Sequence, residues 1–160
     1  MSRFFVCLSV FLLGLLCGCA SSAKKYAPRC SLRSKAITKT FESRIQRIRA
    51  DGGLKPLAWD YPLRRAAQKQ SNYLALIGNL EHGRGGGPLV RLRKLGISRQ
   101  RVGENIARVI HDDNPALTTI RYWTGRKTEL ANLKNPEFFR MGLGVTASEK
   151  HCYSVLVLSE

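Results

Sequence analysis

The sequence predicts an α+β domain in which helices pack against a small antiparallel sheet. Between residues 36 and 124, several segments place apolar residues at helical spacing, whereas residues 141–158 change to the two-residue period of strands. A chain of 160 residues is long enough for one domain with a buried core. No internal repeat or heptad run divides the chain, so we expect one layered unit.

Start and stop signals mark the first two predicted helices. Residues 51–53, Asp-Gly-Gly, end the first helix. Asp60 is a suitable N-cap for the second helix, Pro62 fits its first turn, and Gly78 ends it. The apolar positions expected to face inward are Ile37, Phe41, Ile45 and Ile48 in the first helix, and Leu63, Ala66, Ala67, Tyr73, Leu74 and Ile77 in the second.

Two shorter helices and a hairpin complete the predicted domain. After a mobile, glycine-rich loop at residues 83–87, Pro88 opens a third helix and Gly96 closes it. Residues 114–115, Asn-Pro, open a fourth helix that carries Trp123 on its inner face. At the end of the chain, apolar residues 141, 143 and 145 alternate with glycines, residues 148–150 form a turn, and residues 151–158 form a second strand.

The chain is strongly basic. Its 27 Lys and Arg residues face 11 Asp and Glu residues, which gives a net charge of +16. Such a surface attracts polyanions, including nucleic acid, anionic lipid and acidic cell-wall polymers, although a solvated basic surface without a specific partner is an equal alternative. The basic residues are spread along the chain and no aromatic-rich RNA-binding signature accompanies them, so we expect no specific nucleic-acid partner.

The N-terminus has the pattern of a targeting segment. Residues 1–18 combine an early positive charge with an apolar run that is too short to span a membrane, which is typical of a secretory signal. The stretch around Cys19 resembles the bacterial lipobox, so Cys19 is the expected lipidation site, with Cys17 as the alternative. Several acyl chains would anchor the protein stably in the cell envelope, and Ala20 resembles an outer-membrane sorting signal if the cell has two membranes.

Residues 19–35 are then expected to act as a tether and residues 36–160 to form the domain. Two cysteines, Cys30 and Cys152, remain after processing. An even pair in an oxidising compartment predicts one disulfide between the N-terminal segment and the last strand, and two unpaired thiols are the alternative. Closing so long a loop contributes about 4 kcal/mol in the chain-entropy model.

Short blocks in a defined order then suggest a family. They are RIRADGGLKPLAWD at residues 47–60, Glu81-His82, GENIA at residues 103–107, Trp123 followed by Asn132-Leu133 and Asn135-Pro136, and RMGLGV at residues 140–145. No single block is specific, but their order resembles the CAP superfamily of cysteine-rich secretory proteins, antigen 5 and plant pathogenesis-related proteins, above all its bacterial SCP-like branch. The resemblance covers about residues 40–158. It implies a three-layer α-β-α sandwich with a cleft that holds His82 and Glu104.

The chain departs from the family pattern inside that cleft. The second histidine of the family aligns with Glu129, and the acid that eukaryotic members often carry after the tryptophan is replaced at residues 125–127. The cleft candidates are therefore His82, Glu104, Asn105 and Glu129. The set of His82, Glu104 and Glu129 would bind a divalent metal only weakly, because zinc favours nitrogen and sulfur ligands and calcium needs more oxygens.

Several roles are open for these residues. Glu104 can be a general base or metal ligand, but a buried carboxylate that pairs with His82 and fixes the surrounding loop is the favoured interpretation. Asn105 is expected to satisfy loop backbone groups, and His111 is a conceivable replacement ligand. No nucleophile elbow and no phosphate-binding loop occur in the sequence.

The sequence as a whole predicts a lipid-anchored protein of the bacterial envelope that binds a ligand rather than converting one. Candidate ligands are anionic lipid, lipopolysaccharide, peptidoglycan or a small apolar molecule, bound through the cleft and the basic surface. The alternative is a metal-assisted hydrolase that uses His82, Glu104 and Glu129. No cofactor is firmly indicated, and we expect a monomer.

Overall fold

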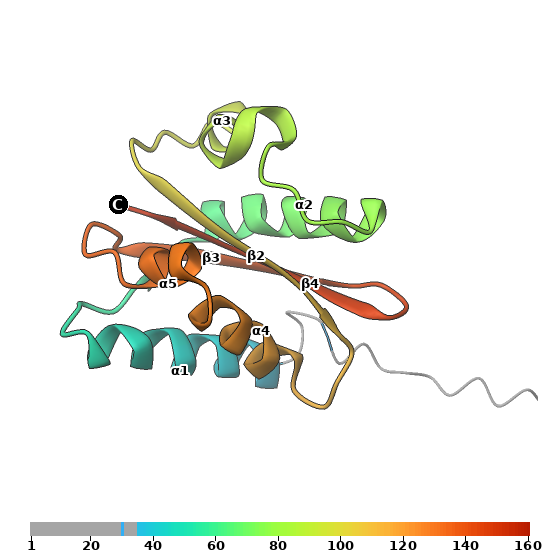
Figure 1. Ribbon diagram of the computed structural model, residues 1–160. Helices are drawn as coiled ribbons and strands as arrows, with labels where there is room; N and C mark the ends of the chain where they lie inside the picture. The colour runs from blue at the N-terminus through green and yellow to red at the C-terminus, as the bar shows by residue number, and fades with distance from the viewer. Residues whose placement is uncertain (1–29, 31–34) are drawn as a thin grey trace, which may run out of the picture.

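The computed structural model describes Cys30 and residues 35–160, which form an α+β domain of three layers (Figure 1). A four-stranded sheet lies between two groups of helices. One face is covered by α2 (Tyr61–Ile77) and α3 (Gly87–Lys94), and the other by α1 (Lys35–Asp51), α4 (Pro115–Thr124) and α5 (Lys127–Leu133). The predicted fold class is confirmed.

The helix signals act as the sequence predicts. The Oδ1 atom of Asp60 accepts a hydrogen bond from the backbone N–H of Leu63 at 2.9 Å, which caps α2. Gly78 ends that helix in the left-handed conformation, with φ of 67°. Asn114 caps α4 in the same way as Asp60 caps α2. The glycine-rich loop includes a 3₁₀ turn, η1 (Arg84–Gly86), directly before α3.

The predicted hairpin forms the centre of the sheet. Strand β3 (Arg140–Ala147) pairs antiparallel with β4 (His151–Ser159), and β4 pairs antiparallel with β2 (Val102–Ile110). The two-residue strand β1 (Ala58–Trp59) adds a parallel edge to β3, so the sheet order is β1-β3-β4-β2. The sequence pattern predicted neither β2 as a strand nor α5 as a helix.

Two glycines in β3 allow α2 to lie against the sheet. A Cβ atom added to Gly142 would stand 2.2 Å from the backbone of Leu63, and one added to Gly144 would stand 2.3 Å from the backbone of Ala67. Both distances are far inside van der Waals contact. The Gly-x-Gly spacing of β3 therefore sets how closely the helix and the strand approach each other.

The core on the α1 side includes a buried arginine. Arg49, in the last turn of α1, is 1% exposed, and burial lowers the pKa of its guanidinium. Its side chain donates hydrogen bonds to the backbone carbonyls of Lys55 at 2.7 Å and of Leu133, Asn135 and Phe138 at 3.0 Å each. Arg49 thus joins α1 to the segment between α5 and β3, which is how its charge is tolerated in the interior.

The disulfide between Cys30 and Cys152 is confirmed, with a Cα–Cα distance of 5.8 Å and a sequence separation of 122 residues. It attaches the segment before α1 to β4. The predicted signal segment, Cys19 and most of the predicted tether lie outside the described residues. Within residues 35–160, none of the helices has both the length and the apolar character needed to cross a membrane.

Candidate functional site

Strand β2 directs Glu104 and Asn105 to opposite faces of the sheet, because successive side chains of a strand alternate. Ile106, two positions after Glu104, packs in the core on the α2 side, whereas Ala107 packs in the core on the α1 side. Glu104 therefore belongs to the α2–α3 side of the domain. Its side chain is only 1% exposed, so the carboxylate needs partners inside the protein.

His82 is the first partner of this carboxylate. Its Nδ1 atom lies 2.9 Å from Oε1 of Glu104, although 22 residues separate the two in the sequence. The His82 side chain is 53% exposed and follows α2 in the loop that leads to η1. The imidazole of His82 thus covers one oxygen of the buried carboxylate, and the imidazole itself remains accessible from solvent.

Arg91 of α3 is the second partner, and it was not among the residues predicted for the cleft. Its Nη2 donates to Oε2 of Glu104, and its Nη1 donates to the carbonyls of His82 at 2.8 Å and Arg84 at 3.0 Å. One guanidinium therefore holds both the buried carboxylate and the loop that carries His82. In the sequence, a partner for Glu104 would be expected among the basic residues. Helix α3 also carries Arg93 and Lys94, and the positions of these three residues in the sequence do not show which one reaches Glu104.

Both oxygens of Glu104 are consequently occupied. A general base needs an oxygen that a substrate or a water molecule can reach, and a metal ion would have to compete with the positive charge of Arg91. The pair of His82 and Glu104, stabilised by Arg91, is suited to holding the loop between α2 and α3 in place. The second ring nitrogen of His82 lies outside this pair, on a side chain that is 53% exposed.

Glu129 does not join this pair to form a metal centre. Within the described part of the chain, no three His, Cys, Asp or Glu side chains gather closely enough to hold an ion. The backbone carbonyl of Glu129 accepts a hydrogen bond from Asn105 Nδ2 at 2.9 Å, on the α5 side of the sheet. The predicted metal set of His82, Glu104 and Glu129 is therefore wrong. Glu129 contacts Asn105, and the alternation of side chains along β2 places Asn105 on the opposite face of the sheet from Glu104.

Asn105 has a structural role on that second face. It is fully buried, and its Oδ1 accepts a hydrogen bond from Asn132 Nδ2 at 2.8 Å. Together with the bond to Glu129, this contact fixes α5 against β2. Gly103 contributes to the same packing, because a Cβ atom at this position would stand 2.7 Å from the ring of Phe138.

His111 lies beyond the opposite end of β2 from Glu104. Its Nε2 atom is 3.1 Å from the carbonyl oxygen of His151, and His151 pairs with Ile110 at the end of the β2–β4 ladder. Seven residues of extended chain, at about 3.3 Å each, separate it from Glu104. His111 is thus not a replacement ligand for the cleft.

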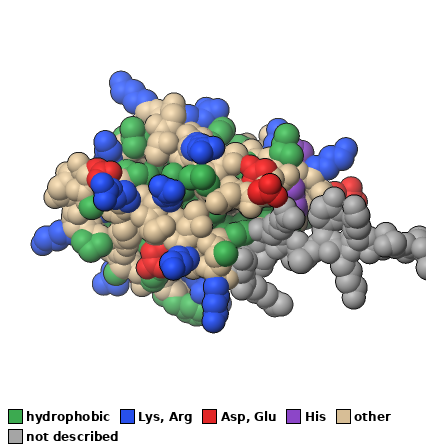
Figure 2. Space-filling view, turned by 90° about the horizontal axis from the view of Figure 1, so that it is seen from below, with side chains coloured by type: hydrophobic (Ala, Val, Ile, Leu, Met, Phe, Trp, Pro, Cys, Tyr) green, Lys and Arg blue, Asp and Glu red, His purple; other side chains and the backbone are tan. Residues whose placement is uncertain are grey.

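The basic surface is dispersed on the side of α1. Figure 2 shows this face, with Lys and Arg side chains scattered over it and Asp and Glu side chains between them. This distribution agrees with the even spread of basic residues along the sequence. On this face the positive charge forms no single patch, so it favours non-specific attraction of polyanions over recognition of one shape.

Comparisons with known proteins give a family and a fold. The sequence model of the cysteine-rich secretory protein family, CAP, matches residues 42–159. An outer surface protein from Borrelia burgdorferi has a similar structure, with a TM-score of 0.72 and 19% identity, over 81% of this chain and 96% of that protein. Among proteins with curated descriptions, none matches this chain.

Two further bacterial structures are similar over 78% of this chain at 23% identity. An extracellular protein containing an SCP domain from Bacillus anthracis has a TM-score of 0.62, and a cysteine-rich secretory protein from Staphylococcus aureus has a TM-score of 0.58. This chain spans 41% and 38% of those two proteins, respectively. At such identities these similarities show the fold alone.

Proposed function

The chain belongs to the cysteine-rich secretory protein family, CAP, and on that premise we propose that it binds an anionic ligand at the bacterial cell surface without converting it. The ligand is an anionic lipid or an anionic polymer of the envelope. The net charge of +16 supplies long-range attraction, which is effective over about 8–10 Å at moderate salt.

The arrangement around Glu104 carries the non-enzymatic part of this proposal. The only carboxylate of the predicted cleft that faces the α2–α3 side has one oxygen on His82 and the other on Arg91. A Glu104 carboxylate that acted as general base or metal ligand would need an oxygen that these two partners leave free. The observed pairing supports a role for Glu104 in holding the loop between α2 and α3.

The location at the cell surface is supported by two independent observations. The first is the pattern of residues 1–18 and Cys19, which predicts export and lipidation. The second is the description of the similar bacterial proteins as outer surface or extracellular proteins. The disulfide between Cys30 and Cys152 is compatible with an oxidising compartment.

Vesicle binding tests the proposal. We expect the purified full chain with Cys19→Ser, which lacks the predicted lipidation site, to be retained by phosphatidylglycerol vesicles and not by phosphatidylcholine vesicles. Because salt screens exposed charges, retention should fall steeply between about 0.1 and 1 M sodium chloride, where the Debye length shrinks from about 10 to about 3 Å. Equal retention on the two kinds of vesicle would contradict the proposal, as would retention that salt does not change.

A further inference from the structure

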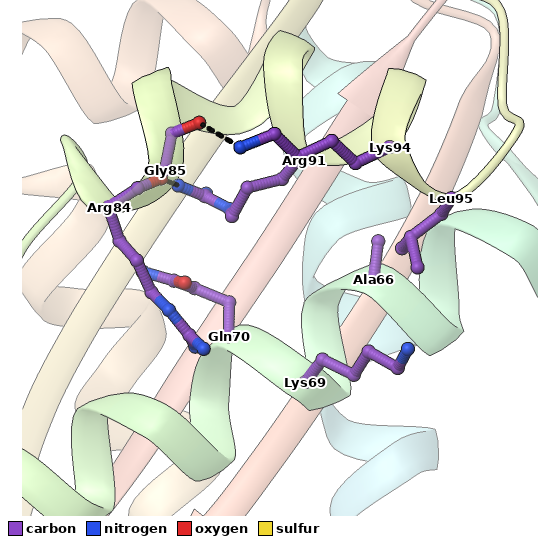
Figure 3. A pocket seen from close by; sticks show the side chains of 8 residues that line it. All are labelled: Ala66, Lys69, Gln70, Arg84, Gly85, Arg91, Lys94 and Leu95. Atoms are coloured by element: carbon purple, nitrogen blue, oxygen red, sulfur yellow. Dashed lines mark hydrogen bonds between the residues drawn. The ribbon is translucent and has the colours of Figure 1, made fainter.

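A cavity of about 240 Å³ lies between α2 and the η1–α3 segment (Figure 3). Arg91, the partner of Glu104, is one of its lining residues. In Figure 3 the side chains from α2 and those from η1 and α3 face one another across this space. We call it the α2–α3 pocket. Its lining residues are Ala66, Lys69, Gln70, Arg84, Gly85, Arg91, Lys94 and Leu95.

The charge of the α2–α3 pocket is entirely positive. Its lining includes Lys69, Arg84, Arg91 and Lys94 and no carboxylate. The charge of Arg91 is balanced by Glu104, and the Arg84 guanidinium lies over the ring of Tyr73, 3.8 Å from its centroid. Such a lining is suited to a ligand that carries more than one negative charge.

Two of these cations remain available for a ligand. Within residues 35–160, Lys69 forms no ion pair or hydrogen bond through its ammonium group, and that of Lys94 donates one long hydrogen bond, to the carbonyl of Gly85 at 3.4 Å. Both residues are exposed. Outside the lining, the carboxylate of Glu104 pairs with Arg91, and that of Glu81 accepts a hydrogen bond from the Tyr73 hydroxyl at 3.2 Å. Neither carboxylate forms an ion pair with Lys69 or Lys94.

Gln70 gives the α2–α3 pocket a second, independent feature. The residue is 1% exposed, and its Nε2 donates to the carbonyl of Glu81 at 2.8 Å. Its Oε1 is buried and has no hydrogen-bond partner among the described residues. An amide oxygen only accepts hydrogen bonds, so it requires an O–H or N–H donor, and a buried acceptor without one is costly.

We propose that the α2–α3 pocket binds a phosphate group carried by a short polyol. Lys69, Arg84 and Lys94 would hold the phosphate oxygens, and a hydroxyl of the polyol would donate to Oε1 of Gln70. A phosphate monoester carries close to two charges and three terminal oxygens, so it matches several cations better than a carboxylate does.

The size of the pocket limits the ligand. Its volume of about 240 Å³ is below the range of about 300–1,000 Å³ that is typical for drug-sized ligands, so it fits a head group rather than a whole lipid. Glycerol phosphate has the required chemistry, either as a free molecule or as the head group of a membrane lipid. This inference rests on the proposed binding of anionic ligands and gives that function a specific place.

Calorimetric titration of the full chain with Cys19→Ser tests the inference. The probes are sn-glycerol 3-phosphate, propyl phosphate and inorganic phosphate, at one pH and one ionic strength. We expect saturable binding of glycerol phosphate, and about tenfold weaker binding of propyl phosphate because it lacks the hydroxyls that Gln70 would accept. Equal affinity for glycerol phosphate and propyl phosphate would overturn the role of Gln70.

A matched pair of variants tests the cations. Lys69→Gln with Lys94→Gln removes two charges from the pocket, whereas Lys127→Gln with Lys134→Gln removes two charges from α5 and the residue after it, on the other side of the sheet. The pocket variant should bind glycerol phosphate about tenfold more weakly, and the control within about twofold of the unchanged chain. Equal losses in both variants, or no saturable binding at all, would overturn the proposal.

Vesicle retention of the same two variants separates this inference from the proposed function. If phosphatidylglycerol vesicles retain the unchanged chain but glycerol phosphate does not bind, the α2–α3 pocket is not the binding site. The dispersed basic surface then accounts for the retention. Loss of vesicle retention in the pocket variant alone supports a lipid head group as the source of the phosphate. Binding of glycerol phosphate without vesicle retention supports a free phosphate ester, and contradicts the membrane ligand.

Discussion

Arg91 of α3 and Glu104 of β2 form an ion pair in which the guanidinium side chain is 15% exposed and the carboxylate side chain 1% exposed. The same guanidinium donates to the carbonyl of His82, so the pair also positions the histidine that contacts Glu104. A buried carboxylate is stable only while these partners remain, because an uncompensated buried charge is costly.

Replacement of Arg91 is therefore expected to destabilise the protein. Arg91→Ala leaves Glu104 with His82 alone, and we expect a loss of about 3 kcal/mol in the free energy of unfolding. Urea unfolding followed by circular dichroism measures this loss. Arg93→Ala is the matched control, because Arg93 lies on the same helix and is exposed. Similar losses in both variants would contradict the role of the pair.

Gly142→Ala is expected to separate α2 from β3. The added Cβ would stand 2.2 Å from the backbone of α2, so the helix has to shift, and we expect a loss of about 3 kcal/mol in the free energy of unfolding. Gly83→Ala is the control, because its Cβ would meet nothing within 4 Å and the backbone φ at Gly83 is −73°. If thermal unfolding shows the two variants equally stable, the close packing of α2 on β3 is not what Gly142 provides.

Loss of the disulfide should lower stability, because the unfolded chain gains conformational freedom when the crosslink is absent. Cys30 and Cys152 are 122 residues apart, and opening a loop of this length costs about 4–5 kcal/mol in the chain-entropy model. We expect Cys30→Ala with Cys152→Ala to lower the melting temperature, and a reducing agent to lower that of the unchanged chain but not that of the variant. An unchanged melting temperature in reducing buffer would contradict this account.

Acid should weaken one contact at the end of the chain. Burial raises the pKa of the Glu160 carboxyl, but the backbone N–H groups of Gln100 and Arg101 and the charge of Arg99 outweigh this and lower it overall. Because the folded pKa is lowered, the contribution of Glu160 to stability is present above the ordinary glutamate pKa of about 4.3 and is lost as the pH falls through the folded pKa.

The variant Glu160→Gln measures that contribution. The unchanged chain should be slightly more stable than the variant at pH 7, and the difference in the free energy of unfolding should shrink as the pH is lowered below about 4.3. The carboxylate oxygens accept from Gln100 at 2.8 Å and from Arg101 at 2.9 Å, so the effect is local. A difference in stability that grows on acidification would contradict a lowered pKa of Glu160 in the folded protein.

The sequence was sufficient to predict most of the elements because their signals are local. Asp60 and Gly78 mark the ends of α2, and the alternation around Gly142 marks β3. β2 was missed as a strand because residues 103–107 are buried on both faces and show no alternation of apolar and polar side chains. α5 was missed because it has seven residues and lacks a side-chain N-cap.

The candidate site was only partly predictable, for a different reason. The pairing of His82 with Glu104 followed from the family resemblance, and the structure places their side chains 2.9 Å apart. Arg91 and Gln70 depend on how α2 and α3 pack together, which no local pattern in the sequence specifies. The error concerning Glu129 had a similar origin, because alignment with the family position does not state which face of β2 a side chain contacts.

The most direct measurement is vesicle binding by Glu104→Gln. An amide at this position keeps the shape of the side chain and removes the charge that pairs with Arg91, so some stability is lost and binding has to be expressed per folded molecule. We expect phosphatidylglycerol vesicles to retain folded Glu104→Gln as well as they retain the unchanged chain. Loss of retention in fully folded Glu104→Gln would show that ligand binding depends on this carboxylate, and would contradict a purely structural role for Glu104.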